Sequence, residues 1–220
     1  MSTLSVIITA GGNGKRMGST LPKQFMLINE RPILMYTIEQ FYHFDPKAQI
    51  ILTLPEEWKI HWEKLIQEHD FRIPHRIVSG GERRYDSIKN ALGHCYGDYI
   101  MVHDGVRPLV NHETLKACII EVKFKDAVIP IIPINESIRR MEDRTTKAVN
   151  REDYVIVQTP QCFKRDVLLN AYDQPYHDGI TDDATLVEES GVPIHCVQGN
   201  PENIKITTRA DLSYAEQLLK

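Results

Sequence analysis

The sequence has 220 residues, of which 42% are hydrophobic and 25% charged, and a chain of this length can bury a continuous core without disulfides or metals. The formal net charge of −4 argues against a nucleic-acid-binding surface, because phosphate backbones recruit broad basic faces. No apolar run reaches membrane-spanning length and the N-terminus lacks a signal-peptide pattern, so we expect a soluble, cytoplasmic protein that does not act at membranes.

Short apolar runs alternate with segments of helical period along most of the chain. In chain order, strands are predicted at residues 5–9, 49–54, 76–79, 99–103 and 127–132. Helices are predicted after Pro32, around 58–66, at 87–95 and after Asn111, a suitable N-cap. This alternation predicts an α/β fold, with a Rossmann-like, mostly parallel sheet and helices on both faces, in one domain over residues 1–220.

The alternation stops after Pro133, where residues 134–157 are polar, charged and poor in apolar periodicity. A loop of this length inside a compact domain is usually functional or is an arm exchanged with a partner. We interpret it as an extended β-arm whose two strands turn near Asp143. A flexible surface loop is an equally reasonable interpretation of the same composition.

The α/β pattern resumes after the arm. A helix is predicted after Lys164, followed by a short helix that Thr181 caps and Gly191 ends. Strands are predicted at 194–198 and 203–207, and Thr208 is the expected cap of a final helix.

A glycine-rich loop follows the first strand, at the sheet edge where ligands bind in such folds. It does not match the P-loop, because Arg16 stands where Ser or Thr is needed after Gly14-Lys15. It does not match the dinucleotide motif, because Met17 replaces the third glycine and no acidic residue ends the second strand. Glycines that admit phosphate oxygens, together with Arg16 and Lys23, suit a triphosphate, whereas Lys15 fits a solvated surface charge.

Five ordered motifs carry a resemblance to a known family. They are AGGNGKRMGSTLPKQF at 10–25, GGERRYDS at 80–87, HDGVRP at 103–108, TPQ at 159–161 and NIK at 203–205. Together they resemble the 2-C-methyl-D-erythritol 4-phosphate cytidylyltransferases of the non-mevalonate isoprenoid pathway. The related ribitol-5-phosphate cytidylyltransferases share several of these motifs, but TDDATLVE at 181–188 is closer to the erythritol enzymes. Gly11, Gly105 and Ser137 depart from the usual residues of that family.

The resemblance implies transfer of a cytidylyl group from CTP to the methylerythritol phosphate, with release of pyrophosphate. Arg16 and Lys23 would offset the charge of the triphosphate, and Arg151 and Lys205 would hold the phosphate of the acceptor. The nucleotide-binding set it implies is Ala10, Gly11, Gly12, Gly14, Lys23, Gly81, Glu82 and Ser87. The acceptor-binding set is Asp104, Arg107, Ser137, Arg151, Thr159, Thr181 and Lys205.

The same resemblance implies Mg²⁺ or another divalent cation as cofactor, with Asp104 as its ligand or as a contact of the sugar hydroxyls. Arg107 fits either the acceptor phosphate or an ion pair with Asp104. If the arm carries Arg151 to a neighbouring subunit, the protein is a homodimer with shared sites.

Two other classes of function are compatible with a sheet of this type: a nicotinamide-dependent oxidoreductase and a non-catalytic nucleotide-binding protein. The failed dinucleotide motif argues against the first, and the many polar groups predicted at one sheet edge argue against the second. His103, beside Asp104, and the scattered cysteines, including Cys162, are interpreted as structural.

Overall fold

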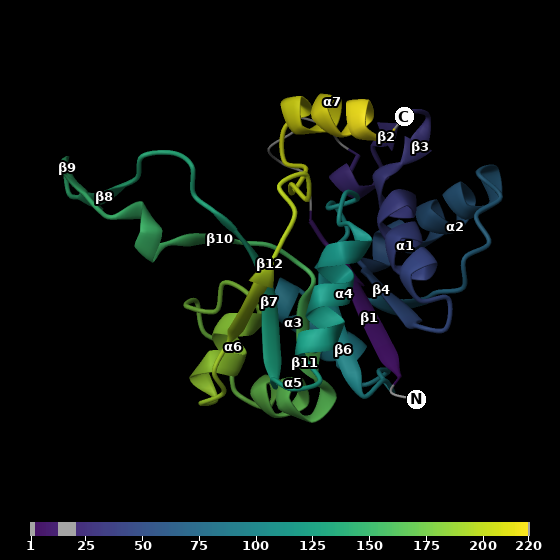
Figure 1. Cartoon of the computed structure of the whole chain (residues 1–220). Helices are drawn as coiled ribbons and strands as arrows, with labels where there is room; N and C mark the ends of the chain where they lie inside the picture. The colour runs from purple at the N-terminus through teal and green to yellow at the C-terminus, as the bar shows by residue number, and fades with distance from the viewer. Residues whose placement is uncertain (1–2, 13–20, 220) are drawn as a thin grey trace.

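The computed structural model describes residues 3–12 and 21–219 and shows an α/β body from which one arm projects (Figure 1). The strands are β1 (Leu4–Thr9), β2 (Leu27–Ile28), β3 (Arg31–Pro32), β4 (Gln49–Leu54), β5 (Arg76–Ser79), β6 (Tyr99–Asp104), β7 (Ala127–Pro133), β8 (Arg139–Glu142), β9 (Thr145–Ala148), β10 (Val155–Val157), β11 (Gln161–Lys164) and β12 (His195–Gln198). The α-helices are α1 (Ile33–Phe44), α2 (Lys59–Glu68), α3 (Arg84–Leu92), α4 (His112–Glu121), α5 (Arg165–Tyr172), α6 (Asp183–Glu189) and α7 (Arg209–Leu218). Short 3-10 turns are η2 (Lys23–Phe25), η3 (Glu56–Trp58) and η4 (Arg151–Asp153).

The central sheet has eight strands in the order β10-β7-β11-β6-β1-β4-β5, with β12 also paired to β7. β1 pairs in parallel with both β4 and β6, and β4 pairs in parallel with β5. Only β10 and β11 run antiparallel to their neighbours. The predicted Rossmann-like, mostly parallel sheet is therefore confirmed.

Helices cover both faces of this sheet, as the strand pattern requires. In β1, Val6 and Ile8 lie in one apolar cluster with side chains of α1, α2 and α4. Ile7, between them, lies in a second cluster with side chains of α3, α5 and α6. All three residues are fully buried, because successive side chains of a strand point to opposite faces and both faces are covered here.

The segment after β7 forms the predicted arm. β8 and β9 pair as an antiparallel hairpin, all of whose residues are exposed, and Asp143 makes the turn with φ of 49°. Figure 1 shows this hairpin far from the body of the molecule. The chain rejoins the sheet at Val155, where β10 begins, so the arm ends slightly earlier than the sequence indicates.

Several predicted boundaries are wrong. Residues 203–207 form no strand, because single bonds such as Ile206 N–H to the Val106 carbonyl (2.9 Å) hold this segment instead of a ladder. Asp182, not Thr181, caps α6, since its carboxylate accepts the Thr185 N–H at 2.8 Å. The helix predicted at 87–95 begins at Arg84, and β11 was missed.

Candidate active site

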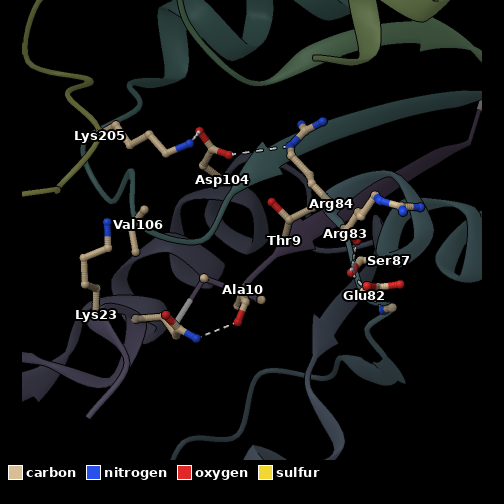
Figure 2. A pocket seen from close by; sticks show the side chains of 14 residues that line it. Thr9, Ala10, Lys23, Glu82, Arg83, Arg84, Ser87, Asp104, Val106 and Lys205 are labelled. Carbon is tan, nitrogen blue, oxygen red and sulfur yellow. Dashed lines mark hydrogen bonds and ion pairs between the residues drawn. The ribbon is translucent and has the colours of Figure 1, made fainter. Parts of the chain in front are cut away.

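A cavity lies where β1 and β6 end, at the edge of the sheet predicted to bind ligands (Figure 2). The described residues that line it are Thr9, Ala10, Gly11, Gly12, Lys23, Gln24, Gly81, Glu82, Arg83, Arg84, Ser87, Asp104, Val106 and Lys205. This set contains every predicted nucleotide-binding residue in the described ranges. Gly14 and Arg16 lie outside the described residues.

One side of the cavity is built by the turn between β5 and α3. The Ser87 hydroxyl accepts the Gly81 N–H at 3.0 Å and donates to the Arg83 carbonyl at 3.0 Å. A side chain at Gly81 would collide with Asp86, so only glycine fits this closed turn. Ser87 lies in the first turn of α3 and shapes the loop that presents Glu82 to the cavity.

The loop after β1 is anchored by the Pro-Lys-Gln motif. Gln24, which is buried, donates its side-chain N–H to the Ala10 carbonyl at 2.6 Å, and the Ala10 N–H bonds the Thr53 carbonyl at 3.1 Å. Ala10 is thus held from both sides, while Gly11 and Gly12 after it are exposed at the cavity. This arrangement leaves backbone of the glycine turn facing the ligand space.

Lys23 enters the cavity from η2 with only 7% of the residue exposed. Its Nζ donates to the carbonyl of Ile206 at 3.3 Å, directly after Lys205 in the chain. Figure 2 shows Lys23 pointing toward Val106 and Lys205 reaching Asp104 above it. Lys23, from the first motif, therefore contacts the same short segment that carries Lys205, from the last motif.

Asp104 is the centre of a charged cluster. Its Oδ2 lies 3.1 Å from Lys205 Nζ and 3.1 Å from Arg107 Nε, and its Oδ1 lies 4.0 Å from Arg84 Nε. Burial alone would raise the pKa of Asp104, but Lys205, Arg84 and Arg107 together hold it well below its usual value. Asp104 is a permanent anion at neutral pH and orients the basic side chains around it.

Arg107 makes the ion pair with Asp104 that the sequence left open as one of two roles. Its guanidinium also donates to the Asn203 carbonyl at 2.7 Å, and its side chain is 12% exposed. Arg107 is absent from the described lining of the cavity. We conclude that it fixes Asp104 and the segment carrying Lys205.

The residues around Asp104 do not fit a resident divalent cation. Its carboxylate already faces three basic side chains, and no group of three or more acidic, histidine or cysteine side chains in the described ranges could hold a metal ion. Mg²⁺ prefers carboxylates together with phosphate oxygens and waters. The described protein atoms alone therefore supply no metal site at Asp104.

Arg84 also lines the cavity, and the sequence reasoning gave it no role. Two of its nitrogens lie 3.0 and 2.6 Å from the two carboxylate oxygens of Asp183, which is fully buried. Tyr172 donates to the same carboxylate at 2.6 Å. The signal available in the sequence was the position of Arg84 between Gly81 and Ser87, inside a motif expected to bind the nucleotide.

Besides Arg107, four predicted acceptor residues lie outside the described lining of this cavity. Ser137 and Arg151 are exposed on the arm, and Arg151 donates to the Asn135 carbonyl. Thr181 lines a smaller neighbouring pocket that shares Arg83 and Arg84 with the main cavity. Thr159 is buried and its hydroxyl bonds His103 and the Asp104 N–H, so its contact with an acceptor stays a prediction.

Comparisons with known proteins identify the family of this chain. A profile of the 2-C-methyl-D-erythritol 4-phosphate cytidylyltransferase family matches residues 4–220. The chain belongs to this family. A 2-C-methyl-D-erythritol 4-phosphate cytidylyltransferase of Bacteroides fragilis is 48% identical over 216 residues, covering 98% of this chain and 99% of that protein. One of Phocaeicola vulgatus is 46% identical over 215 residues, covering 97% and 98%.

Solved structures support the fold of this cytidylyltransferase family member. The crystal structure of 4-diphosphocytidyl-2C-methyl-D-erythritol synthase from Anaerococcus prevotii superposes with a TM-score of 0.84, covering 99% of this chain and 98% of that one. At 24% identity this likeness concerns the fold alone. None of the described helices is both long and apolar enough to cross a bilayer.

Proposed function

We propose that this nucleotidyltransferase joins the cytidylyl group of CTP to 2-C-methyl-D-erythritol 4-phosphate and releases pyrophosphate. The observation that carries the proposal is the bond between Lys23 Nζ and the Ile206 carbonyl, beside Lys205. Lys23 thereby contacts the segment that carries Lys205, and both side chains line the same cavity. Two phosphate-bearing substrates can meet between them.

The reaction needs positioning and charge stabilisation more than covalent chemistry. An oxygen of the acceptor phosphate bonds to the α-phosphorus of CTP, and the bond from that phosphorus to the oxygen bridging the β-phosphate breaks. Lys23 would neutralise charge on the triphosphate as pyrophosphate leaves, a role predicted for Arg16 as well. Lys205, held by Asp104 at 3.1 Å, would orient the attacking phosphate.

The nucleotide end of the cavity would bind cytosine and ribose. The turn is closed by the bond from the Gly81 N–H to the Ser87 hydroxyl, and it presents backbone groups and Glu82 to the cavity. A pyrimidine needs few polar partners at fixed positions, which such a turn supplies. The opposite end, around Asp104 and Lys205, is left for the acceptor.

The divalent cation is best regarded as part of the nucleotide substrate. Because Asp104 is surrounded by basic side chains, Mg²⁺ would enter on the phosphate oxygens of CTP. Bound there, it supplies charge neutralisation of the triphosphate.

The arm would meet a second copy of the chain and complete that copy's acceptor site. Its exposed apolar residues, Met141 at 70% and Tyr154 at 47%, and the exposed Val155 and Ile156 of β10 at its base are unusual for a surface without a partner. Arg151 and Ser137 lie on this arm, remote from their own cavity's lining. A homodimer would account for both features. A cytoplasmic location fits the free thiols of all four cysteines.

The test is a substrate panel. Purified protein with CTP and Mg²⁺ should release pyrophosphate with methylerythritol phosphate, with kcat/KM at least about tenfold above that for ribitol 5-phosphate. A preference for ribitol 5-phosphate would assign the other acceptor. CTP binding without turnover of any polyol phosphate would indicate a non-catalytic binding protein, and a fluorescence change on NADH titration would favour the oxidoreductase.

A further inference from the structure

His103 lies at the end of β6, directly before Asp104, and is fully buried. Its ring packs edge-on against Phe41, with 4.9 Å between ring centroids. It is not among the described residues that line the cavity, so it has no access to a substrate. Both of its nitrogens nevertheless have polar partners within the motifs of the site.

The proton positions on this ring follow from its partners. Nε2 lies 3.0 Å from the Arg107 carbonyl, which can only accept, so Nε2 carries a hydrogen. Burial lowers the pKa of His103 to about 4, so the ring is neutral at pH 7 and Nδ1 must accept. The Thr159 hydroxyl, 3.0 Å from Nδ1, is then the donor.

The same hydroxyl completes a closed network. Having donated to His103, Thr159 Oγ1 accepts the Asp104 N–H at 3.2 Å. The ring thus joins three pieces of chain: the end of β6, the turn at Arg107, and the segment before β11. Arg107 returns from that turn to the Asp104 carboxylate at 3.1 Å. Because every donor and acceptor in this network is paired, a shift of one member would break its bonds to the others.

We infer that His103 is a positioning residue of the transfer reaction, which donates from Nε2 to the Arg107 carbonyl and holds Asp104 and Arg107 in register through Thr159. The inference rests on the proposed function, because its consequence is a correctly placed Lys205 and acceptor phosphate. It involves no contact with either substrate. The nucleotide turn at Gly81 and Ser87 is outside this network.

A second histidine offers a matched control. His75 accepts the Trp62 indole N–H on Nε2 at 3.0 Å, and its Nδ1, 2.8 Å from the Ile73 carbonyl, must carry the hydrogen. His75 is therefore bonded to one donor and one carbonyl, as His103 is, but neither Trp62 nor Ile73 bonds Asp104, whereas both Arg107 and Thr159 do.

The experiment compares His103→Leu, His103→Gln and His75→Leu by steady-state kinetics and thermal unfolding. His103→Leu should raise the KM of the acceptor about tenfold, the loss expected when one hydrogen-bonded network is broken, and leave the KM of CTP within about twofold. His103→Gln, whose amide can still donate to the Arg107 carbonyl, should recover most of that loss. His75→Leu should lower Tm and change neither KM.

A double variant separates this role of Thr159 from direct contact with the acceptor. If Thr159 acts through His103, the combination of His103→Leu with Thr159→Val should raise the KM of the acceptor no more than the worse single variant. If the two substitutions instead raise the acceptor KM by the product of their single effects, the inference is contradicted. An unchanged acceptor KM in folded His103→Leu, with active wild type, would overturn it as well, whereas an inactive wild type would instead refute the proposed function.

The ring's hydrogen can be observed without any assay of activity. ¹⁵N NMR of the intact protein at pH 7 should show His103 neutral with its hydrogen on Nε2, and His75 neutral with its hydrogen on Nδ1. The Thr159→Val variant should shift the Nδ1 resonance of His103 and leave His75 unchanged. A hydrogen on Nδ1 of His103, or a charged ring, would overturn the inference even if His103→Leu fails to fold.

Discussion

Arg84 and Asp183 form a two-pronged ion pair between the nucleotide turn and α6, with nitrogen–oxygen distances of 3.0 and 2.6 Å. Asp183 is fully buried, whereas 31% of the Arg84 side chain is exposed at the cavity. Although burial opposes it, the Asp183 carboxylate raises the pKa of Arg84 above its ordinary value. The pair joins a residue of the cavity lining to the buried start of α6 across 99 positions of sequence.

Removing Arg84 should therefore destabilise the protein strongly. Arg84→Ala leaves the Asp183 carboxylate buried without its cation, which costs about 3–5 kcal/mol. Urea unfolding at pH 7 measures this loss. Arg72→Ala, which removes the exposed pair with Asp70, is the control and should leave the midpoint unchanged. Equal midpoints for the two variants would show that the Arg84–Asp183 pair contributes little.

The two cavity lysines should affect different substrates. Lys23→Ala removes a cation from the triphosphate and should lower kcat about a hundredfold, and Arg16→Ala is predicted to do the same. Lys205→Ala should chiefly raise the KM of the acceptor. Initial rates of pyrophosphate release measure both effects, with Lys64→Ala on the exposed face of α2 as control. Wild-type turnover in Lys23→Ala would contradict its role.

Gly81→Ala tests the closed turn. The added Cβ would collide with Asp86 and push the turn away from Ser87, so the KM of CTP should rise by about tenfold or more while the acceptor KM stays near its wild-type value. Gly93→Ala is a suitable comparison, because its Cβ would meet only the Asn90 carbonyl at 3.8 Å. A Gly81→Ala enzyme with normal CTP affinity would show that the turn does not shape the nucleotide site.

The neutral state of His103 predicts acid sensitivity of folding. Its pKa is about 4 in the folded protein against an ordinary value of 6.5, so between these values the unfolded chain binds the extra proton. Stability should fall as the pH drops through this window, by on the order of 3 kcal/mol in total. The loss linked to Asp104 comes below it, because that pKa is lowered from 3.8.

Urea unfolding at pH 7 and pH 5 measures this dependence. His103→Gln has no ring to protonate, so its stability should change less between the two pH values than that of the wild type. If the wild type and His103→Gln lose the same stability between pH 7 and pH 5, the acid sensitivity arises from other groups. One such group is His75, whose pKa is also lowered by burial.

Mixing two inactive variants tests the arm. If Arg151 acts in the partner's site, Arg151→Ala and Lys205→Ala homodimers are both impaired. Random exchange then gives mixed dimers with one intact site, and activity should return to about a quarter of the wild-type value. Light scattering before and after exchange checks the oligomeric state. Activity that does not exceed the average of the two parents would place Arg151 outside the partner's site.

The order of strands and helices could be predicted from sequence because it depends on local patterns. The β-branched run of β1 and the cap at Asn111 each depend on backbone preference and burial within a few residues. The structure has both the strand and the capped helix α4. The strand predicted at residues 203–207 is absent because the conformation of this segment depends on residues that are distant in the sequence. There the segment Asn-Ile-Lys-Ile-Thr is held by single bonds to the carbonyls of Val106 and Thr159, which no local pattern encodes.

Sequence alone determined the α/β class, the ligand-binding edge, and the motifs that contribute Ala10, Lys23, Gly81, Ser87 and Lys205 to the cavity. Only the tertiary structure decided how charges and hydrogens are shared among them. The pairing of Arg84 with Asp183, the three cations around Asp104, and the hydrogen on His103 Nε2 all join positions that are close only after folding. A side chain's charge state and partner depend on burial and distance, which the order of residues does not specify.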